Sequence, residues 1–528
     1  MNVEEEERKK VQNLENEEKE EEIKTDFTWF KNARIYQIFI DRYAGIKENY
    51  NEEELKTSFL YGNIKALLNK LDYIASMNFN VIWLSPFFCN QPNGYHGYHP
   101  INFNHVDPRF AYGEHPIDNE TGNPFDPQDF DLITSSDKML IEFIQKCHEK
   151  NFKVMMDLVP NHVHETHPFF IDAKNNKESK YRKWFYFVED MTEEEKKELF
   201  PTDEQLNPPE PEPQNSEEKD KNQPIPQVEE SKEENKSNEN PKVENPPPEV
   251  NEGINDPNQP KEEESPKEEE SLPPEKHYCL PYLAFFHLGE LPKLNLDTRE
   301  CGDYMINIVR KYLKFGIDAV RVDHAPGPSL NFLKRMTREI HKEFPTVPFI
   351  GEVPPVGMFQ VAETIKGISL EKLRKVNQQS LDIVPFIDDI FNDYEGVLDG
   401  LLDFTFKYII DCHIWGYIQK EEDTIQNIKE HYERFKDSKL ILTKFLDSHD
   451  ENRFLFTCNQ NRNLMKRMVD ILFMHFEGRD DPLVIYYGTE DFMTQYKNKD
   501  DEPFGDAFSR QPMNFEFEWL KKHFDKKK

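Results

Sequence analysis

Cysteine is scarce in this chain, which holds only six among 528 residues. The six stand far apart and have no neighbouring histidines at zinc spacing, at positions 89, 147, 279, 301, 412 and 458. Neither a disulfide framework nor a zinc finger is therefore expected.

Long apolar runs are also missing. No stretch approaches the roughly 20 consecutive apolar residues that a membrane-spanning helix needs. The N-terminus, Met1-Asn-Val-Glu-Glu-Glu-Glu-Arg-Lys-Lys10, lacks the apolar centre of a signal peptide. We therefore expect a cytoplasmic protein with no membrane partner.

Positive charge is outnumbered, because 101 Asp and Glu residues face 66 Lys and Arg residues, for a net charge of −35. Residues 191–276 hold 27 Asp or Glu against 10 Lys or Arg, and residues 1–24 hold 10 against 5. The rest of the chain is only mildly acidic. Nucleic acids and anionic membranes attract basic patches, so we expect neither as a partner. A neutral or cationic partner fits better.

Aromatic residues are absent between Pro201 and His277, where Pro, Glu, Lys, Asn and Ser dominate. Such a stretch cannot bury enough apolar surface to offset the entropy lost on ordering. We predict that residues 191–276 are disordered, and that residues 1–26 form a disordered acidic tail. Binding of a partner by the Pro/Glu-rich segment as an extended chain is the alternative.

The remaining sequence alternates short apolar runs with helical patterns, which is typical of βα units around a parallel sheet. Eight candidate strands can be counted, at residues 34–39, 81–84, 154–158, 319–322, 348–351, 401–404, 440–445 and 483–487. They predict an α/β fold, a (β/α)₈ TIM barrel, built from residues 27–162 and 301–528. Residues 163–300 are too long for a simple connection, and we expect them to form a subdomain inserted after the third strand.

Three carboxylic acids follow apolar runs at predicted strand ends. Asp323 ends the fourth strand, Glu352 the fifth and Asp450 the seventh. A lone acid in such a place is more often a helix cap. Because the ends of parallel barrel strands meet at one rim, three together favour a catalytic site. Glycosidic bonds are cleaved by such carboxyl groups, one of which acts in retaining enzymes as nucleophile and another as acid and then base.

Arg321 stands two residues before Asp323, so both side chains should lie on the same face of the strand. The guanidinium would keep the aspartate ionised and hold its orientation. A purely structural ion pair would account equally well for this spacing. Glu352 would instead need a raised pKa, which burial and a nearby carboxylate can supply.

Histidine and tyrosine also gather at the predicted rim. His162 and His449 close strand-end segments, and His96 and Tyr98 belong to the loop Gly94-Tyr-His-Gly-Tyr-His99. Imidazoles can donate hydrogen bonds to sugar hydroxyls, and tyrosine rings can stack on sugars. A packed loop would also use tyrosine, but the place at the rim favours binding.

Four segments resemble, in order, the signature regions of the α-amylase family of glycoside hydrolases. They are Asp157-Leu-Val-Pro-Asn-His162, Asp318-Ala-Val-Arg-Val-Asp323, Gly351-Glu-Val353 and Asp447-Ser-His-Asp450. Leu291-Pro-Lys-Leu-Asn295 is similar to the fifth region of neopullulanase-like and cyclomaltodextrinase-like members. The resemblance covers nearly all of the chain outside the acidic segments.

This resemblance implies α-retaining hydrolysis of α-1,4-glucosidic bonds in starch, glycogen or maltooligosaccharides through a covalent glycosyl-enzyme. It implies that Asp323 is the nucleophile, Glu352 the general acid and base, and Asp450 the carboxylate that binds and distorts the sugar. The substrate-binding residues would be Arg321, His162, His449, Tyr98, His96 and Asp157. An α-glucan transglycosylase, or a catalytically weak glucan-binding or scaffold protein on the same fold, stays open.

The chain departs from the family in two places. The eighth predicted strand ends at residue 487, so the C-terminal β-domain of many members is expected to be absent, and a homo-oligomer could cover the exposed barrel surface. Calcium-binding members use the asparagine that matches Asn161 and a Lys-His pair after the nucleophile, whereas Asp323 is followed by His-Ala-Pro-Gly-Pro. No cofactor is expected to be required, with calcium at Asn161 left open.

Overall fold

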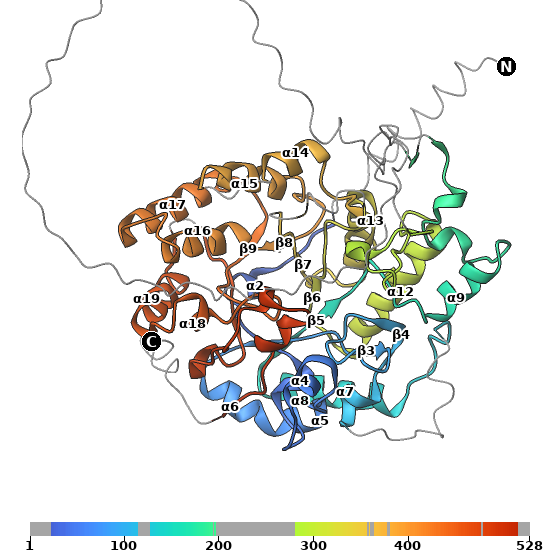
Figure 1. Cartoon of the computed structure of the whole chain (residues 1–528), viewed down its shortest axis with the longest axis horizontal. Coiled ribbons are helices and arrows are strands. Elements are labelled where there is room, and N and C mark those ends of the chain that lie inside the picture. Colours follow the sequence, from blue (N-terminus) through green and yellow to red (C-terminus); the bar gives the residue numbers. More distant parts are fainter. Residues whose placement is uncertain are drawn as a thin grey trace, which may run out of the picture. The chain divides into compact units, whose positions relative to one another are not determined.

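The computed structural model describes residues 23–113, 127–193, 195–196, 280–355, 358, 364–376, 381–476 and 479–515. Eight parallel strands form its centre (Figure 1): β1 Arg34–Ile38, β2 Val81–Leu84, β5 Lys153–Leu158, β6 Ala319–Val322, β7 Phe349–Gly351, β8 Gly400–Leu402, β9 Ile441–Thr443 and β10 Leu483–Tyr486. Every strand expected from the sequence is present, and no bound differs by more than two residues.

The eight strands close into a barrel. Their order in the sheet is β10-β1-β2-β5-β6-β7-β8-β9, so β9 and β10 are the two edges. A parallel bridge between Lys444 and Leu483 joins those edges. It is held by hydrogen bonds from Lys444 N to Pro482 O, at 2.9 Å, and from Val484 N to Lys444 O, at 2.8 Å. The predicted (β/α)₈ barrel is thereby confirmed.

The interior of the barrel is filled by alternate residues of the strands, because successive side chains of a strand point to opposite faces. The inward positions are apolar in the lower layers, and they include Ile35, Val81, Trp83, Met155, Ala319, Ile350, Leu402, Ile441 and Val484. The short helix α2, Thr28–Lys31, adds the fully buried Phe30 to this cluster. One end of the barrel is therefore sealed by apolar packing.

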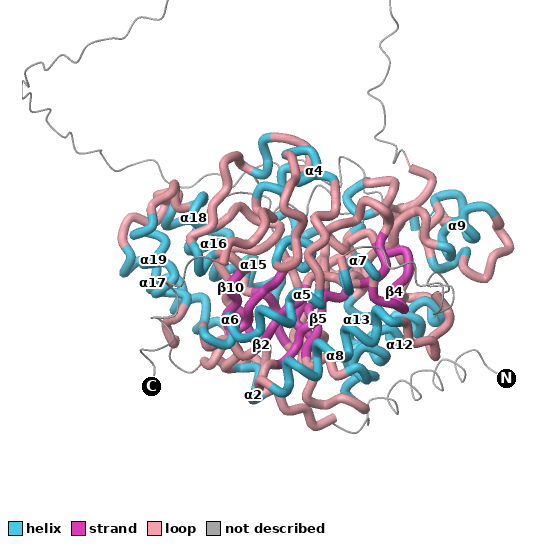
Figure 2. The backbone as a smooth tube through the Cα atoms, turned by 90° about the horizontal axis from the view of Figure 1, so that it is seen from below, coloured by secondary structure: helices cyan, strands magenta, loops and turns pink. Residues whose placement is uncertain are grey.

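Helices cover the outside of the strands, as Figure 2 shows with helices in cyan around strands in magenta. They include α5 Ile64–Leu67, α6 Leu71–Ser76, α8 Ser135–Glu149, α12 Arg299–Phe315, α13 Leu330–His341, α14 Leu370–Lys375, α15 Val384–Asn392, α16 Phe404–Ile414, α17 Glu421–Arg434, α18 Phe454–Thr457 and α19 Arg462–Leu472. In α13 the Ser329 side chain caps the first turn, and Leu333, Met336 and Ile340 are buried on one face. Such amphipathic faces form the second core against the sheet.

The loop after β2 contains an antiparallel pair that the sequence did not predict. Strands β3, Phe88–Asn90, and β4, Pro100–Val106, pair with shifts in register. The buried residues of β4 include Asn102, Asn104 and His105. Since these polar side chains interrupt the apolar alternation, the pattern gave no strand signal.

An aromatic lobe follows β5, the third strand of the barrel. It contains α9, Pro168–Asn175, in which Phe170 contacts Tyr282 at 4.8 Å between ring centroids. An isolated bridge between His162 and Lys293 joins the lobe to the end of the barrel. The expected subdomain at residues 163–300 falls here, and its bounds stay a prediction.

The segments predicted to be disordered lie outside the described residues, apart from residues 23–26, 191–193 and 195–196. Their disorder therefore stays a prediction. Within the described part of the chain, we find no helix that is both long and apolar enough to cross a membrane.

Candidate active site

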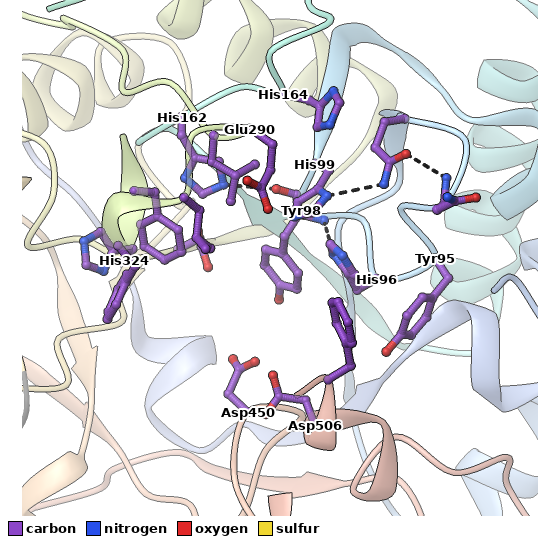
Figure 3. Close-up of a pocket in the computed structure, with 18 of the residues that line it drawn as sticks. Tyr95, His96, Tyr98, His99, His162, His164, Glu290, His324, Asp450 and Asp506 are labelled. Carbon is purple, nitrogen blue, oxygen red and sulfur yellow. Dashed lines mark hydrogen bonds between the residues drawn. The ribbon is translucent and has the colours of Figure 1, made fainter. Parts of the chain in front are cut away.

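A cavity of about 770 Å³ opens at the carboxyl ends of the barrel strands. It is lined by six of the predicted site residues, Asp323, Glu352, Asp450, His96, Tyr98 and His162. Figure 3 shows Tyr98 and Asp450 pointing into the same open space from opposite sides. The other three, Arg321, Asp157 and His449, contact members of this set directly.

Arg321 is the centre of the site, and its side chain is fully buried. Its Nη1 lies 2.7 Å from Asp157 Oδ1 and 2.7 Å from Asp323 Oδ1. Its Nη2 lies 2.6 Å from Glu352 Oε1. Asp157 and Arg321 are register partners on β5 and β6, at inward positions one layer above Met155 and Ala319. The strand register therefore brings three carboxylates to one guanidinium.

The carboxylates of this cluster carry raised pKa values. Burial raises the pKa of Asp323 well above its usual range, and Arg321 only partly opposes the effect. Burial also raises the pKa of Glu352, against Arg321 and with the help of the nearby Asp450. Arg321 does not by itself return the pKa of Asp323 to its usual range, because one guanidinium is shared by three carboxylates. The ionised state of Asp323 that the sequence suggested stays a prediction. The cluster favours holding at least one proton.

Glu352 follows β7 directly and is oriented by two contacts. Its Oε2 accepts a hydrogen bond from the backbone N–H of His324, at 3.1 Å, while its Oε1 faces Arg321. His324 adopts a left-handed backbone, with φ of +41°, which turns that N–H away from the strand direction. The segment that follows β6 and the segment that follows β7 are thus joined to each other at the site.

Asp450 lies on the other wall and is held in the ionised state. His449 Nε2 lies 2.9 Å from Asp450 Oδ2, and Arg510 Nη2 donates to Asp450 Oδ1 at 2.9 Å. Burial alone would raise the pKa of Asp450, but these two neighbours outweigh it and lower the pKa below its usual value. The opposite shifts at Glu352 and Asp450 separate a proton donor from a permanent anion.

The rings of the site support one another. Tyr98 and His449 stack with centroids 5.1 Å apart and planes within 4°, and Tyr98 Oη donates to Asp157 Oδ2 at 2.9 Å. His162 Nε2 lies 3.0 Å from the carbonyl oxygen of Tyr98, and burial lowers the pKa of His162 to about 3. His96 Nδ1 accepts from the N–H of Tyr98 at 3.0 Å. Neutral imidazoles can exchange hydrogen bonds with sugar hydroxyls.

Several residues of the site were not predicted. Arg510 also donates to the carbonyl of His449 at 2.8 Å, and Asp506 lines the cavity four residues earlier. Both follow β10, and no apolar run precedes them to mark a strand end. Gln37 Nε2 lies 2.9 Å from His449 Nδ1, and Trp83 Nε1 donates to Asp157 at 3.2 Å. For Gln37 a signal was present, namely a polar residue inside an apolar strand.

The proposed calcium ligand is engaged by a lysine. Asn161 Oδ1 accepts a hydrogen bond from the buried Lys293 Nζ at 2.5 Å, and Lys293 also donates to Gly327 O at 2.7 Å. A side chain at Gly327 would place Cβ 2.1 Å from Asn161 Oδ1. Among the described residues, no group of three or more His, Cys, Asp and Glu could hold a metal ion. These residues do not fit calcium, because the lysine occupies the oxygen atoms that calcium prefers.

Comparison with known proteins agrees with this geometry. The family model described as the α-amylase catalytic domain matches residues 30–117 and 118–524. "Alpha-amylase 2" of Dictyoglomus thermophilum is 25% identical over 474 residues, which cover 89% of this chain and 57% of that protein. "Cyclomaltodextrinase" of Geobacillus thermopakistaniensis is 30% identical over 171 residues, 30% of this chain and 25% of that protein. The chain thus spans little more than half the length of the first relative.

The fold is also found among solved structures. The α-amylase of Geobacillus thermoleovorans, solved in complex with acarbose, superposes with a TM-score of 0.57 and 20% identity, covering 94% of this chain and 78% of that one. This likeness concerns the fold alone. The family model, in contrast, extends over all four strand-end segments and the buried cluster around Arg321. The chain belongs to the α-amylase family of glycoside hydrolases.

Proposed function

We propose that this protein is an α-retaining glycoside hydrolase that cleaves α-1,4-glucosidic bonds in starch, glycogen or maltooligosaccharides. One observation carries the proposal. Asp323 and Glu352 are held by the same buried guanidinium at the floor of a cavity, and the ionised Asp450 faces them from another wall. Retaining cleavage requires an ionised nucleophile beside a protonated acid, and a carboxylate cluster that holds one proton on Glu352 and leaves Asp323 ionised would supply both.

In the first step, an oxygen of Asp323 attacks the anomeric carbon as the bond to the leaving oxygen breaks. Glu352 gives its proton to that oxygen, which leaves as a hydroxyl group. In the second step, Glu352 takes a proton from water, and the water oxygen displaces Asp323 from the anomeric carbon. The raised pKa of Glu352 supports its role as the initial proton donor.

The other residues bind the sugar that reacts. Asp450, kept anionic by His449 and Arg510, accepts hydrogen bonds from sugar hydroxyls, which stabilise the positive charge that develops on the ring. His162, His96 and Tyr98 contribute neutral polar groups to the same space. Asp157 holds Arg321, which in turn positions Asp323.

Transglycosylation is the second candidate, and the wall formed by the lobe favours it. Phe285, Phe286 and Leu288 line the cavity, and Phe286 and Leu288 remain 38% and 43% exposed. An apolar surface there would hold an acceptor sugar and disfavour water, so a sugar hydroxyl could replace water in the second step. The reaction otherwise uses the same three acids.

The protein would need no cofactor, since the amine of Lys293 occupies the place beside Asn161 where a cation would lie. We place it in the cytoplasm. The described cysteines, at 89, 147, 301, 412 and 458, are all free and buried, which suits a reducing compartment.

Product analysis tests the function. The purified protein is incubated with starch, glycogen, maltooligosaccharides and cyclodextrins, and products are separated by chromatography while NMR follows the anomeric signal. Shorter maltooligosaccharides that first appear as the α-anomer support retaining hydrolysis, whereas products longer than the substrate identify the transglycosylase. A product that first appears as the β-anomer would contradict the retaining mechanism. If none of the glucans is cleaved, the result would favour a glucan-binding or scaffold protein.

A further inference from the structure

A pair of exposed aromatic side chains lies outside the cavity, on the turn that joins α16 to α17. Trp415 is 52% exposed and Tyr417 is 64% exposed. Their ring centroids lie 6.4 Å apart with the planes at 90°, and Tyr408 meets the edge of Trp415 at 6.3 Å. Neither exposed ring is among the residues that line the cavity. The reaction described above makes no use of them.

The turn that displays these rings is firmly anchored. The N–H of Trp415 donates to Asp411 O at 2.8 Å, and the N–H of Tyr417 donates to Cys412 O at 2.9 Å. Ile418, next in the chain, is only 5% exposed. Gly416 adopts the left-handed conformation, with φ of +84°, that lets the chain reverse at this point. The fold therefore fixes the backbone on both sides of two large rings and leaves the rings in solvent.

We propose that Trp415 and Tyr417 form a second binding site for an α-glucan chain, distinct from the cavity. This inference rests on the proposed function, because it takes the substrate of the cavity to be a polymer of glucose. The apolar C–H faces of sugar rings stack on aromatic rings, whose bodies are large and rigid. Two rings at right angles make a corner, which suits a chain whose α-1,4-linked units turn relative to each other.

The charge around the turn favours a neutral ligand. The first turn of α17 is formed by Glu421, Glu422 and Asp423, of which the last two are exposed. Arg467 pairs with Glu421 at 3.2 Å and the preceding Lys420 is exposed, so the three acids exceed the two cations by one. This small excess of acids gives nucleic acids and other anionic chains no attraction to the turn. Hydroxyl groups, in contrast, can donate hydrogen bonds to them. A neutral polyol is the ligand class that can both stack on the two rings and donate hydrogen bonds to the neighbouring acids.

A second copy of the protein is a weaker occupant. In a two-fold contact the same patch meets itself, so the acids of the two α17 helices would face each other. Two side chains also offer far less area than the roughly 1,200 Å² that a stable interface buries at the low end. The pair is of the right size for a few sugar units.

Such a site would raise kcat/KM for polymeric substrates and leave kcat/KM for short oligosaccharides unchanged. A long chain held at Trp415 and Tyr417 stays near the cavity, which raises its effective concentration there without a new catalytic contact. A trisaccharide that fills the cavity gains nothing from the second site. The ratio of kcat/KM for glycogen to kcat/KM for maltotriose should therefore depend on the two rings.

Affinity electrophoresis in gels that contain glycogen tests the proposal. The binding assay uses Asp323→Asn as background, so that the polymer is not digested, with and without the double change Trp415→Ala and Tyr417→Ala. The apparent Kd for glycogen is expected to rise roughly tenfold, as two lost stacking contacts would give. Phe386→Ala, which removes a ring that is 41% exposed elsewhere, is the matched control and should leave retardation unchanged.

Kinetics and sedimentation complete the design. With Asp323 intact, the double variant should keep kcat/KM for maltotriose and lose several-fold in kcat/KM for glycogen. Unchanged retardation, an equal loss in the Phe386 variant, or equal retardation by a soluble β-glucan each overturns the site. Sedimentation in which the double variant alone falls from dimer to monomer, with glycogen binding kept, assigns the rings to an interface instead. If the wild type cleaves nothing but retardation still depends on the rings, the proposed function fails and the site stands.

Discussion

Two buried carboxylate clusters in the same barrel differ in how many cations they contain. At the helices outside β8, His431 lies 2.8 Å from Asp388 and 3.1 Å from Asp403, and Arg434 lies 2.5 Å from Asp388. Two carboxylates thus face two cations. In the candidate active site, three carboxylates share the single guanidinium of Arg321. The first cluster is balanced and the second is not.

This difference distinguishes a cluster that stabilises the fold from a cluster that can take part in a reaction. In the balanced cluster, burial opposes charge, but His431 outweighs it and leaves the pKa of Asp403 below its usual value. In the unbalanced cluster, burial prevails and the pKa values of Asp323 and Glu352 rise. Only the second cluster lines the cavity. An excess of carboxylates over cations is what lets a proton move during a reaction, and it is expected to reduce stability.

The largest expected effect is the loss of activity when a carboxylate of the unbalanced cluster becomes neutral. Asp323→Asn, and separately Glu352→Gln, should lower kcat/KM on maltooligosaccharides by roughly four orders of magnitude, because the nucleophile or the acid is gone. Reducing-sugar assays measure this. The thermal midpoint should stay equal or rise, since an unbalanced charge is removed. Full activity with either variant would remove that residue from the proposed mechanism.

The balanced cluster should respond in the opposite way. Asp403→Asn removes a partner of His431 and Tyr432, and it should lower the free energy of unfolding by about 3–5 kcal/mol, as expected for a broken buried ion pair. Urea denaturation measures the change. The kcat of the folded fraction should match that of the wild type. A loss of kcat without a loss of stability would show that the two clusters do not differ as described.

The balanced cluster should also make the free energy of unfolding depend on pH in the alkaline range. Burial opposes the charge of His431, but Asp403 and Asp388 raise its pKa from 6.5 to about 9. The folded state then keeps a proton that the unfolded state releases, so the contribution is complete below pH 6.5 and is lost as pH rises through 9. Its size is on the order of 3 kcal/mol. Urea unfolding of the wild type and of His431→Gln between pH 6 and 10 should show the gap closing, and a constant gap would contradict a charged His431.

The smallest effect is expected from a chelator. The amine of Lys293 occupies Asn161 Oδ1 and Gly327 O, so EDTA should change neither the thermal midpoint nor kcat beyond experimental error. Lys293→Met removes that amine and leaves the oxygen atoms free. A calcium-dependent rise in the midpoint of this variant, and not of the wild type, would show that the lysine replaces the ion. Loss of wild-type activity in EDTA would reverse the assignment.

The sequence predicted the strands and the acids well for one physical reason. Barrel strands are buried on both faces, so they read as continuous apolar runs, and their carboxyl ends lie on one rim. Asp323, Glu352 and Asp450 could therefore be placed together before any contact was known. The helices likewise followed from their periodic apolar faces.

The sequence could not show what depends on distant contacts. The position of Arg510 beside Asp450 comes from a loop that has no periodic pattern. The pairing of β3 with β4 rests on buried asparagines that look like loop residues. The sharing of Arg321 among three carboxylates also needed the register of β5 and β6, since the spacing along β6 pointed to Asp323 alone.

The pairing of the first barrel strand with the last sets the moment during synthesis at which the barrel can close. Arg34 is the register partner of Leu483, and Tyr36 hydrogen bonds to Glu490, 454 residues further along the chain. A ribosome that adds about 5–20 residues per second needs on the order of a minute to span that distance. Until β10 has emerged, β1 has one bare edge and the cavity lacks the wall that carries Arg510. A nascent chain should therefore lack a closed barrel and a complete cavity until β10 and the segment that carries Arg510 have been synthesised.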